Sequence, residues 1–191
     1  MKSQKTYIYK DVFTGDEMFS ICYPFTVVDD IVFEVEGKLV SAGGAVDVDV
    51  GCGDAFGGGG DAEQLADAAE TVINVVYSHR LVETSFAKSD FIKYIKAYMN
   101  RVKGYLRKTN PERVAPFMKS AEPFVMKMLK NFDEYSFYMG ESMDAEAAIG
   151  FGFYRSDEAS PTPRFYFFKD GLSLQHPGFG KSLEHPVQER A

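Results

Sequence analysis

The sequence is short of the residues from which most catalytic and metal sites are built. It has only two cysteines, Cys22 and Cys52, among 191 residues. Two thiols make no disulfide framework, no Cys-x-x-Cys motif and no four-thiolate zinc site. A reducing compartment is the default for such a chain, and Cys22 is expected to be a small buried residue of a strand. Cys52 lies in a glycine-rich segment, where a redox role is a minor alternative.

Histidine is equally scarce. His79 stands alone after an apolar run, and His176 and His185 lie in a polar C-terminal segment. Their local context suggests no Ser/His/Asp or Cys/His set, so the chain lacks the residues expected of a hydrolytic or redox enzyme. No apolar run reaches the 18 residues of a membrane span, and no apolar signal-peptide core precedes the first strand-like run. These absences predict a cytoplasmic protein.

Residues 85–131 carry the clearest pattern, because apolar residues recur there at helical spacing in two successive runs. Asn110 is suited to cap a helix, Pro111 to its first position, and Glu112 to the positive end of the helix dipole. A second helix is therefore predicted to begin near Pro111. Two helices with so short a link form an antiparallel hairpin.

The other end of the hairpin is less well marked. Ser85 and Ser89 are both candidate caps of the first helix, and the sequence does not choose between them. Within the second helix, Pro116 lies near the start, where proline is tolerated, whereas Pro123 is predicted to kink the helix.

Charge is strongly segregated along the chain. From Lys88 to Lys130 there are 11 Lys and Arg residues and 3 acids, a net charge of +8, in a chain whose total is −7. One interpretation is that these cations are simply the water-exposed side chains on the outer faces of the two helices. The functional interpretation is a surface that faces acidic protein tails or nucleic acid. A pI near 5.0 disfavours general nucleic-acid binding. The candidate partner-binding cations are Lys93, Lys96, Arg101, Lys103, Arg107 and Lys108.

Residues 42–66 have the opposite character. They are rich in glycine and in acids, and no Lys or Arg occurs between Lys38 and Arg80. Glycine loses much entropy on ordering and like charges repel, so this segment is predicted to be a mobile acidic loop. It is not a phosphate-binding loop, because the run Gly57 to Gly60 is followed by Asp61 rather than by Lys and Ser or Thr.

Clustered carboxylates make calcium a candidate ligand of this loop. Asp47, Asp49 and Asp54 are the candidate ligands. The segment is not an EF-hand, because Gly51 stands where an oxygen ligand is needed and Gly58 stands in the place of the final Glu. The alternatives are weak calcium binding and a solvated loop without a metal.

Short runs on both sides of the hairpin are predicted to be strands, and the chain from 175 onward to be a poorly ordered tail. Gly37-Lys38 is predicted to be a two-residue turn joining two of these strands. Glu17 and Glu141 each follow a turn-like residue beside aromatic strands, and the pattern alone favours ordinary surface charges for both. The runs are Tyr7–Val12, Ile31–Glu36, Leu39–Val40, Thr71–Tyr77, Tyr135–Met139, Ile149–Phe153 and Phe165–Phe168.

Several blocks together resemble the translationally controlled tumour protein family. They occur in family order and span about residues 7–174. The most extensive is Phe132-Asp133-Glu134-Tyr135-Ser136-Phe137-Tyr138-Met139-Gly140-Glu141. The others are Tyr9-Lys10-Asp11, Asp16-Glu17-Met18-Phe19-Ser20, Glu34-Val35-Glu36-Gly37-Lys38, Glu83-Thr84-Ser85-Phe86, Lys93-Tyr94-Ile95-Lys96-Ala97-Tyr98-Met99, Pro111-Glu112-Arg113-Val114-Ala115-Pro116-Phe117-Met118 and Phe167-Phe168-Lys169-Asp170-Gly171.

The resemblance implies an α+β fold in one domain over residues 1–174. That fold has a tent-like mixed β-sheet body, a protruding antiparallel helical hairpin and a mobile acidic loop. The family's loop signature is not present, since the loop here reads Val50-Gly51-Cys52-Gly53-Asp54. Functions tied to that signature are therefore not implied, and the extension beyond Leu174 has no counterpart in the resemblance.

The resemblance implies a regulatory protein of growth and survival that binds calcium and tubulin or microtubules. It also implies contacts with translation elongation factors and with Ras-family GTPases, and release from the cell without a signal peptide. The family is similar in fold to a Rab GTPase chaperone. Glu17 matches the acid proposed to contact the GTPase, and Glu141 is the second candidate there. No zinc, membrane or sequence-specific nucleic acid is implied.

Overall fold

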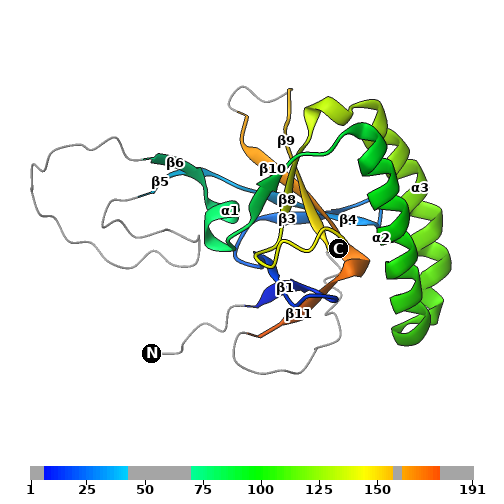
Figure 1. The fold of residues 1–191 in the computed structure, drawn as a ribbon. Helices are drawn as coiled ribbons and strands as arrows, with labels where there is room; N and C mark the ends of the chain where they lie inside the picture. Colours follow the sequence, from blue (N-terminus) through cyan, green and yellow to red (C-terminus); the bar gives the residue numbers. More distant parts are fainter. Residues whose placement is uncertain (1–6, 43–69, 157–160, 177–191) are drawn as a thin grey trace, which may run out of the picture.

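The computed structural model describes residues 7–42, 70–156 and 161–176. The predicted acidic loop lies outside these ranges except for Ala42, and the predicted tail lies outside them from residue 177 onward. Within them the chain is an α+β protein, with antiparallel sheets in the middle and a pair of long helices along one flank (Figure 1).

A six-stranded antiparallel sheet forms the centre of the molecule. Its middle strand β10 is aromatic, and Phe165 and Phe167 are completely buried. The neighbouring strand alternates glycine with Phe because the rings leave no room: a Cβ at Gly150 would lie 2.7 Å from Phe167, and one at Gly152 would lie 2.8 Å from Tyr138. In sheet order the strands are β3 (Phe25–Val28), β4 (Val32–Glu36), β10 (Pro163–Phe168), β9 (Ile149–Tyr154), β8 (Ser136–Met139) and β7 (Val82–Thr84).

A three-stranded sheet packs beside it and joins the two ends of the described chain. Its order is β11 (Leu172–Gln175), β1 (Ile8–Asp11) and β2 (Glu17–Ser20), all antiparallel. Strand β11 corrects the prediction that the chain turns irregular from Gln175, because Gln175 pairs with Ile8. Cys22 follows β2 and is half-buried and disulfide-bonded. The prediction of a buried, reduced thiol is therefore wrong for Cys22.

The predicted turn at Gly37-Lys38 is not a hairpin. Strand β4 pairs with β3 and β10, whereas β5 (Leu39–Ala42) pairs with β6 (Glu70–Ile73) in a separate ribbon. The reason is that the Gly37 N–H donates to the carbonyl of Pro163 at 2.7 Å, which directs the chain away from β4.

The strand predicted over 71–77 is also too long. It ends at Ile73, where α1 (Asn74–Ser78) begins. The buried Asn74 side chain accepts hydrogen bonds from the backbone N–H groups of Lys38 and Val75, both at 2.8 Å, which fixes this change of direction.

The two long helices are α2 (Lys88–Thr109) and α3 (Val114–Lys130), joined by the 3-10 turn η1 (Pro111–Arg113). They lie side by side (Figure 1). Neither Ser85 nor Ser89 caps α2, because the N-cap is Ala87. Asn110 is the N-cap of η1, but among the described residues no side-chain hydrogen bond caps the start of α2, η1 or α3. Helix α3 continues through Pro123.

Both helices are held on the six-stranded sheet by aromatic contacts. From α2, the ring of Phe91 lies 5.2 Å from that of Phe137. From α3, the ring of Phe124 lies 5.2 Å from that of Tyr166 and 5.8 Å from that of Phe168. The buried faces of both helices therefore pack on the sheet, and their opposite faces point away from it (Figure 1).

Candidate functional site

The outward face of α2 carries a row of cations, which we call the α2 stripe: Lys93, Lys96, Lys103 and Arg107. These positions are separated by three, seven and four residues, so at roughly 100° per residue they fall on one side of the helix. The residues that α2 buries lie on the opposite side, and include Ile95, Tyr98 and Val102. Lys93, Lys96 and Arg107 are exposed, whereas Lys103 is half-buried.

The other two predicted cations lie elsewhere on α2. The Arg101 guanidinium is 4.2 Å above the ring of Phe13, and its Nη1 donates to the carbonyl of Glu146 at 2.8 Å. Arg101 therefore fastens α2 to the body instead of extending the α2 stripe. Lys108 is exposed in the last turn, where a cation faces the negative end of the helix dipole.

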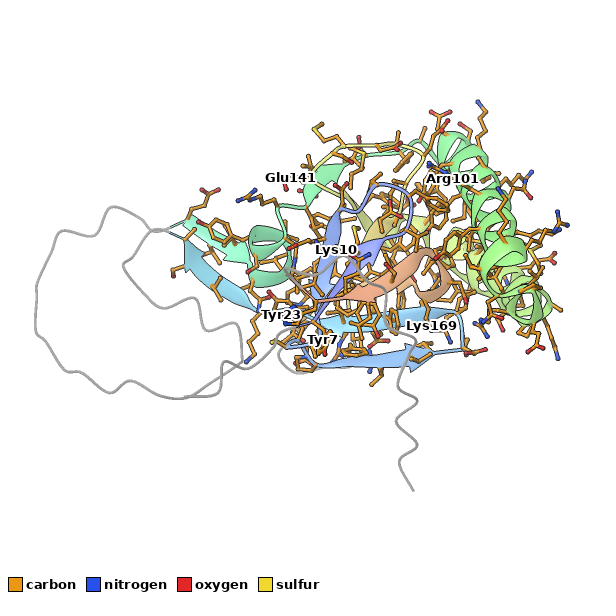
Figure 2. All side chains as sticks on the ribbon, turned by 90° about the horizontal axis from the view of Figure 1, so that it is seen from below. Tyr7, Lys10, Tyr23, Arg101, Glu141 and Lys169 are labelled. Atoms are coloured by element: carbon orange, nitrogen blue, oxygen red, sulfur yellow. The ribbon has the colours of Figure 1, made fainter. Side chains whose placement is uncertain are left out.

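Glu17 and Glu141 come together on the β-sheet body although 123 residues separate them in the chain. Arg80 Nη1 lies 2.8 Å from Glu141 Oε1, and this pair, with a smaller contribution from the charge of Glu17, raises the pKa of Arg80. Glu17 Oε1 lies 3.1 Å from Lys10 Nζ. We call the two acids Glu17 and Glu141, together with their cationic partners Lys10 and Arg80, the acid cluster. Figure 2 labels Lys10 and Glu141.

A second contact explains why Glu141 ends beside Glu17. Asp16, the residue before Glu17, accepts hydrogen bonds from Ser142 at its Oδ2, at 2.5 Å from Oγ and 3.2 Å from the backbone N–H. Gly140 is required in this loop, because a Cβ there would lie 2.4 Å from Asp16 Oδ2. The turn after β8 is therefore tied to the start of β2, and each strand end presents one exposed or half-exposed acid.

His79 lies directly beneath the acid cluster. It is only 7% exposed, and its Nδ1 is 3.9 Å from Glu17 Oε2. Neither ring nitrogen finds a hydrogen-bond partner among the described residues. Burial lowers the pKa of His79, and the nearby Glu17 charge opposes that shift only in part. At neutral pH His79 is therefore an uncharged, buried side chain next to the carboxylate of Glu17.

Arg80 is the residue that sequence reasoning missed. It adopts a left-handed conformation with φ of 52° in the turn between α1 and β7, and its side chain pairs with Glu141. The only sequence signal was its position after the isolated His79, since a pattern of alternating residues carries no information about a turn of this kind.

The predicted calcium ligands Asp47, Asp49 and Asp54 lie outside the described residues. In the described ranges no group of three or more His, Cys, Asp or Glu residues is arranged to hold a metal ion. No helix there is both long enough and apolar enough to cross a membrane.

Comparison with known proteins agrees with this architecture. The family model described as translationally controlled tumour protein matches residues 6–173. The homolog from Schizosaccharomyces pombe is 47% identical over 166 residues, which cover 86% of this chain and 96% of the homolog.

Solved structures give the same result in three dimensions. The S. pombe translationally controlled tumor-associated protein superposes with a TM-score of 0.72 at 44% identity, covering 88% of this chain and 98% of that one. The NMR structure of the Caenorhabditis elegans protein superposes with a TM-score of 0.63 at 29% identity, covering 93% and 100%. The chain therefore belongs to the translationally controlled tumour protein family.

Proposed function

We propose that this protein is a non-enzymatic regulator that binds acidic segments of partner proteins, tubulin tails among them, through the α2 stripe. The observation that carries the proposal is the placement of Lys93, Lys96, Lys103 and Arg107 on the one face of α2 that points away from the sheets. The residues 88–130 carry a net charge of +8 on a chain of −7, so an acidic partner is attracted to this flank and repelled elsewhere.

The family resemblance implies further partners, which we also propose for this protein. A translation elongation factor is a protein partner of the same kind, provided that it offers an acidic segment. Calcium held by Asp47, Asp49 and Asp54 would act on the acidic part of the chain, not on the α2 stripe. The cytoplasm, where these partners reside, is the proposed location, with release from the cell as an additional route.

Charge reversal on the α2 stripe tests the proposal. Lys93→Glu, Lys96→Glu and Arg107→Glu combined should weaken tubulin binding at low salt by about tenfold or more, since exposed ion pairs contribute roughly 0.2–1 kcal/mol each and repulsion adds to their loss. All three side chains are exposed, so the melting temperature should change little. Binding is measured by co-sedimentation with microtubules at several salt concentrations.

The matched control is a single charge reversal at an exposed lysine far from the hairpin. Lys38→Glu changes the net charge by the same amount as Lys96→Glu, but Lys38 precedes the β5–β6 ribbon at the opposite end of the molecule (Figure 1). Lys96→Glu should weaken binding several-fold and Lys38→Glu should not. Equal, salt-resistant binding of the triple variant would contradict the proposal.

The acid cluster supports a second candidate function, the regulation of a Ras-family GTPase. The specific observation is that Glu17 and Glu141 flank Arg80 on one surface, although the sequence separates them widely. Such a surface offers two carboxylates and one guanidinium to the charged loops around a bound nucleotide.

Nucleotide release from a loaded GTPase tests this second candidate. If the protein accelerates release, Glu17→Ala should abolish most of the acceleration, whereas Glu112→Ala, an exposed acid on the hairpin, should leave it unchanged. If nucleotide release is equally fast with the Glu17→Ala and Glu112→Ala variants, the acid cluster does not regulate the GTPase.

A further inference from the structure

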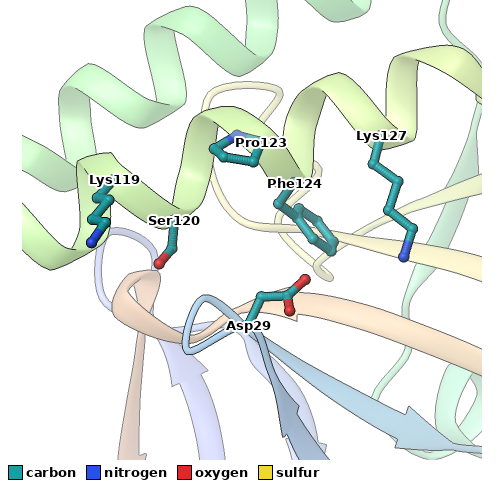
Figure 3. Close-up of a pocket in the computed structure, with 6 residues that line it drawn as sticks. All are labelled: Asp29, Lys119, Ser120, Pro123, Phe124 and Lys127. Atoms are coloured by element: carbon teal, nitrogen blue, oxygen red, sulfur yellow. The ribbon is translucent and has the colours of Figure 1, made fainter.

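We propose that a hollow between α3 and the β3–β4 turn binds an extended acidic peptide that carries one apolar side chain between two carboxylates. This inference deepens the proposed function, on which it rests, by adding a second contact and a sequence pattern for the acidic partner. The hollow has a volume of about 320 Å³ and is lined by Asp29, Lys119, Ser120, Pro123, Phe124 and Lys127 (Figure 3).

Two lysines mark the ends of the hollow. Lys119 and Lys127 are exposed on the same face of α3, and Figure 3 shows them on either side of the other lining residues. They are eight residues apart, which is roughly 12 Å along the helix axis. Within the described residues neither lysine has an ion-pair partner, whereas the nearby Arg113 and Lys169 are both paired with Asp30. The hollow therefore presents two accessible positive charges at a fixed separation.

The floor between the lysines is apolar and rigid. Phe124 is 4% exposed and held by the rings of Tyr166 and Phe168. Pro123 lies beside it inside the helix, and it has no N–H to donate to the carbonyl of Lys119 four residues earlier. This part of α3 therefore offers an apolar surface and a backbone acceptor that the proline leaves without its usual helical donor.

Asp29 stands opposite this floor, between the two lysines in Figure 3. It is exposed and occupies the left-handed region with φ of 52°, in the tight turn between β3 and β4. Its carboxylate repels an acid placed at the centre of the hollow and accepts a hydrogen bond from a backbone N–H. The middle of the bound segment must therefore be uncharged.

An extended chain matches this arrangement of charges. In a strand the residues i, i+2 and i+4 point to one side, and i and i+4 are about 13 Å apart. Acids at i and i+4 would reach Lys119 and Lys127, and an apolar residue at i+2 would lie on Pro123 and Phe124. The pattern is acid-x-apolar-x-acid. A nucleic acid strand fits less well, because its continuous phosphates would pass Asp29.

The test is a titration of the full-length 15N-labelled chain with synthetic peptides, followed by amide chemical shifts. The first peptide has Glu at positions 1 and 5 and Tyr at position 3, separated by Gly and Ser; the second moves the acids to adjacent positions; the third has Glu at position 3. We expect the first peptide to shift the amides of Asp29, Ser120 and Phe124. It should bind at least five-fold more tightly than the other two.

Variants test whether the two α3 lysines hold the peptide. Lys119→Glu with Lys127→Glu should weaken binding of the first peptide at the α3 amides about tenfold, as judged from the strength of exposed ion pairs, whereas Lys38→Glu, at an exposed lysine outside both the hollow and the α2 stripe, should not. Asp29→Asn should remove most of the preference for Tyr over Glu at position 3, an effect that a merely structural role of Asp29 would not produce. Circular dichroism confirms that each variant is folded.

Three results would overturn the inference: equal affinity for all peptides, no effect of the two α3 reversals, or tighter binding of a short single-stranded RNA at the same amides. The outcome is also distinguishable from the proposed function. Loss of tubulin binding in the α2 triple variant without peptide binding at α3 supports only the α2 stripe. Peptide binding at α3 with unchanged tubulin binding supports only the hollow.

Discussion

Replacing Arg113 with alanine should destabilise the folded protein by about 3 kcal/mol, because it leaves a nearly buried carboxylate without its cation. The Arg113 side chain is 16% exposed, and its Nε and Nη2 donate to the two carboxylate oxygens of Asp170 at 2.7 and 2.9 Å. Asp170 is 7% exposed. Arg113 also donates to the side chain and carbonyl of Asp30 in the β3–β4 turn.

The geometry explains the size of the effect. Arg113 ends η1 at the hairpin link, Asp170 lies in the 3-10 turn after β10, and Asp30 belongs to a third segment, so one side chain joins three parts of the fold. Burial disfavours the charged form of Asp30, but hydrogen bonds from Lys169 and Arg113 together outweigh it and lower the pKa of Asp30. Asp30 is 55% exposed, so its share of the stability is small compared with that of Asp170.

Urea unfolding at neutral pH measures this prediction. Arg107→Ala is the matched control, since Arg107 is an exposed arginine of the same hairpin, and it should change the free energy of unfolding by less than about 0.5 kcal/mol. An Arg113→Ala variant as stable as the Arg107→Ala variant would show that the three segments are held together by apolar packing alone.

Replacing Gly171 with alanine should destabilise the protein by about 3 kcal/mol, at the upper end of the cost of overpacking. A Cβ at Gly171 would lie 1.9 Å from the hydroxyl oxygen of Tyr98. Tyr98 is 1% exposed, and its ring is stacked on Tyr94 at 5.7 Å and packed on Phe168 at 5.9 Å. The ring has no room to move away, so the backbone of the 3-10 turn would have to shift.

A second substitution makes this prediction specific. The Tyr98 hydroxyl has no hydrogen-bond partner among the described residues, so Tyr98→Phe alone should be nearly neutral or stabilising. Combined with Gly171→Ala it should restore most of the lost stability, because the oxygen in the way has been removed. Thermal melting of the four proteins of this cycle gives the coupling. A double variant no more stable than Gly171→Ala would refute the steric explanation.

Local patterns in the sequence predicted those elements whose stability is mostly local. The hairpin was predictable, because the apolar period of Phe91, Ile95 and Tyr98 faces the sheet directly. Strand β11 and the course of β5 were not, because they depend on the pairing of Gln175 with Ile8 and of Leu39 with Ile73, which no local pattern contains. The start of α2 at Lys88 was missed because Ala87 offers no capping side chain.

The candidate site was predictable one residue at a time but not as an arrangement. Glu17 and Glu141 were identified from their strand ends, yet Arg80 between them follows from a left-handed turn that only the fold reveals. Among the predicted cations, Arg101 lies roughly 80° from the start of the α2 stripe at the standard helical rotation, so a helical projection already separates it. The hollow at α3 depends on Asp29, which is 90 residues away in sequence from Lys119.

The most direct test of the central claim is binding of the unmodified protein to tubulin with and without its acidic C-terminal tails. If the α2 stripe recognises acidic segments, removal of the tails should weaken binding about tenfold. The affinity for intact tubulin should also fall steeply between about 0.05 and 0.3 M salt, where charge screening becomes strong. Equal affinity for both forms of tubulin, unaffected by salt, would contradict the claim that the α2 stripe is the surface through which this protein binds acidic partners.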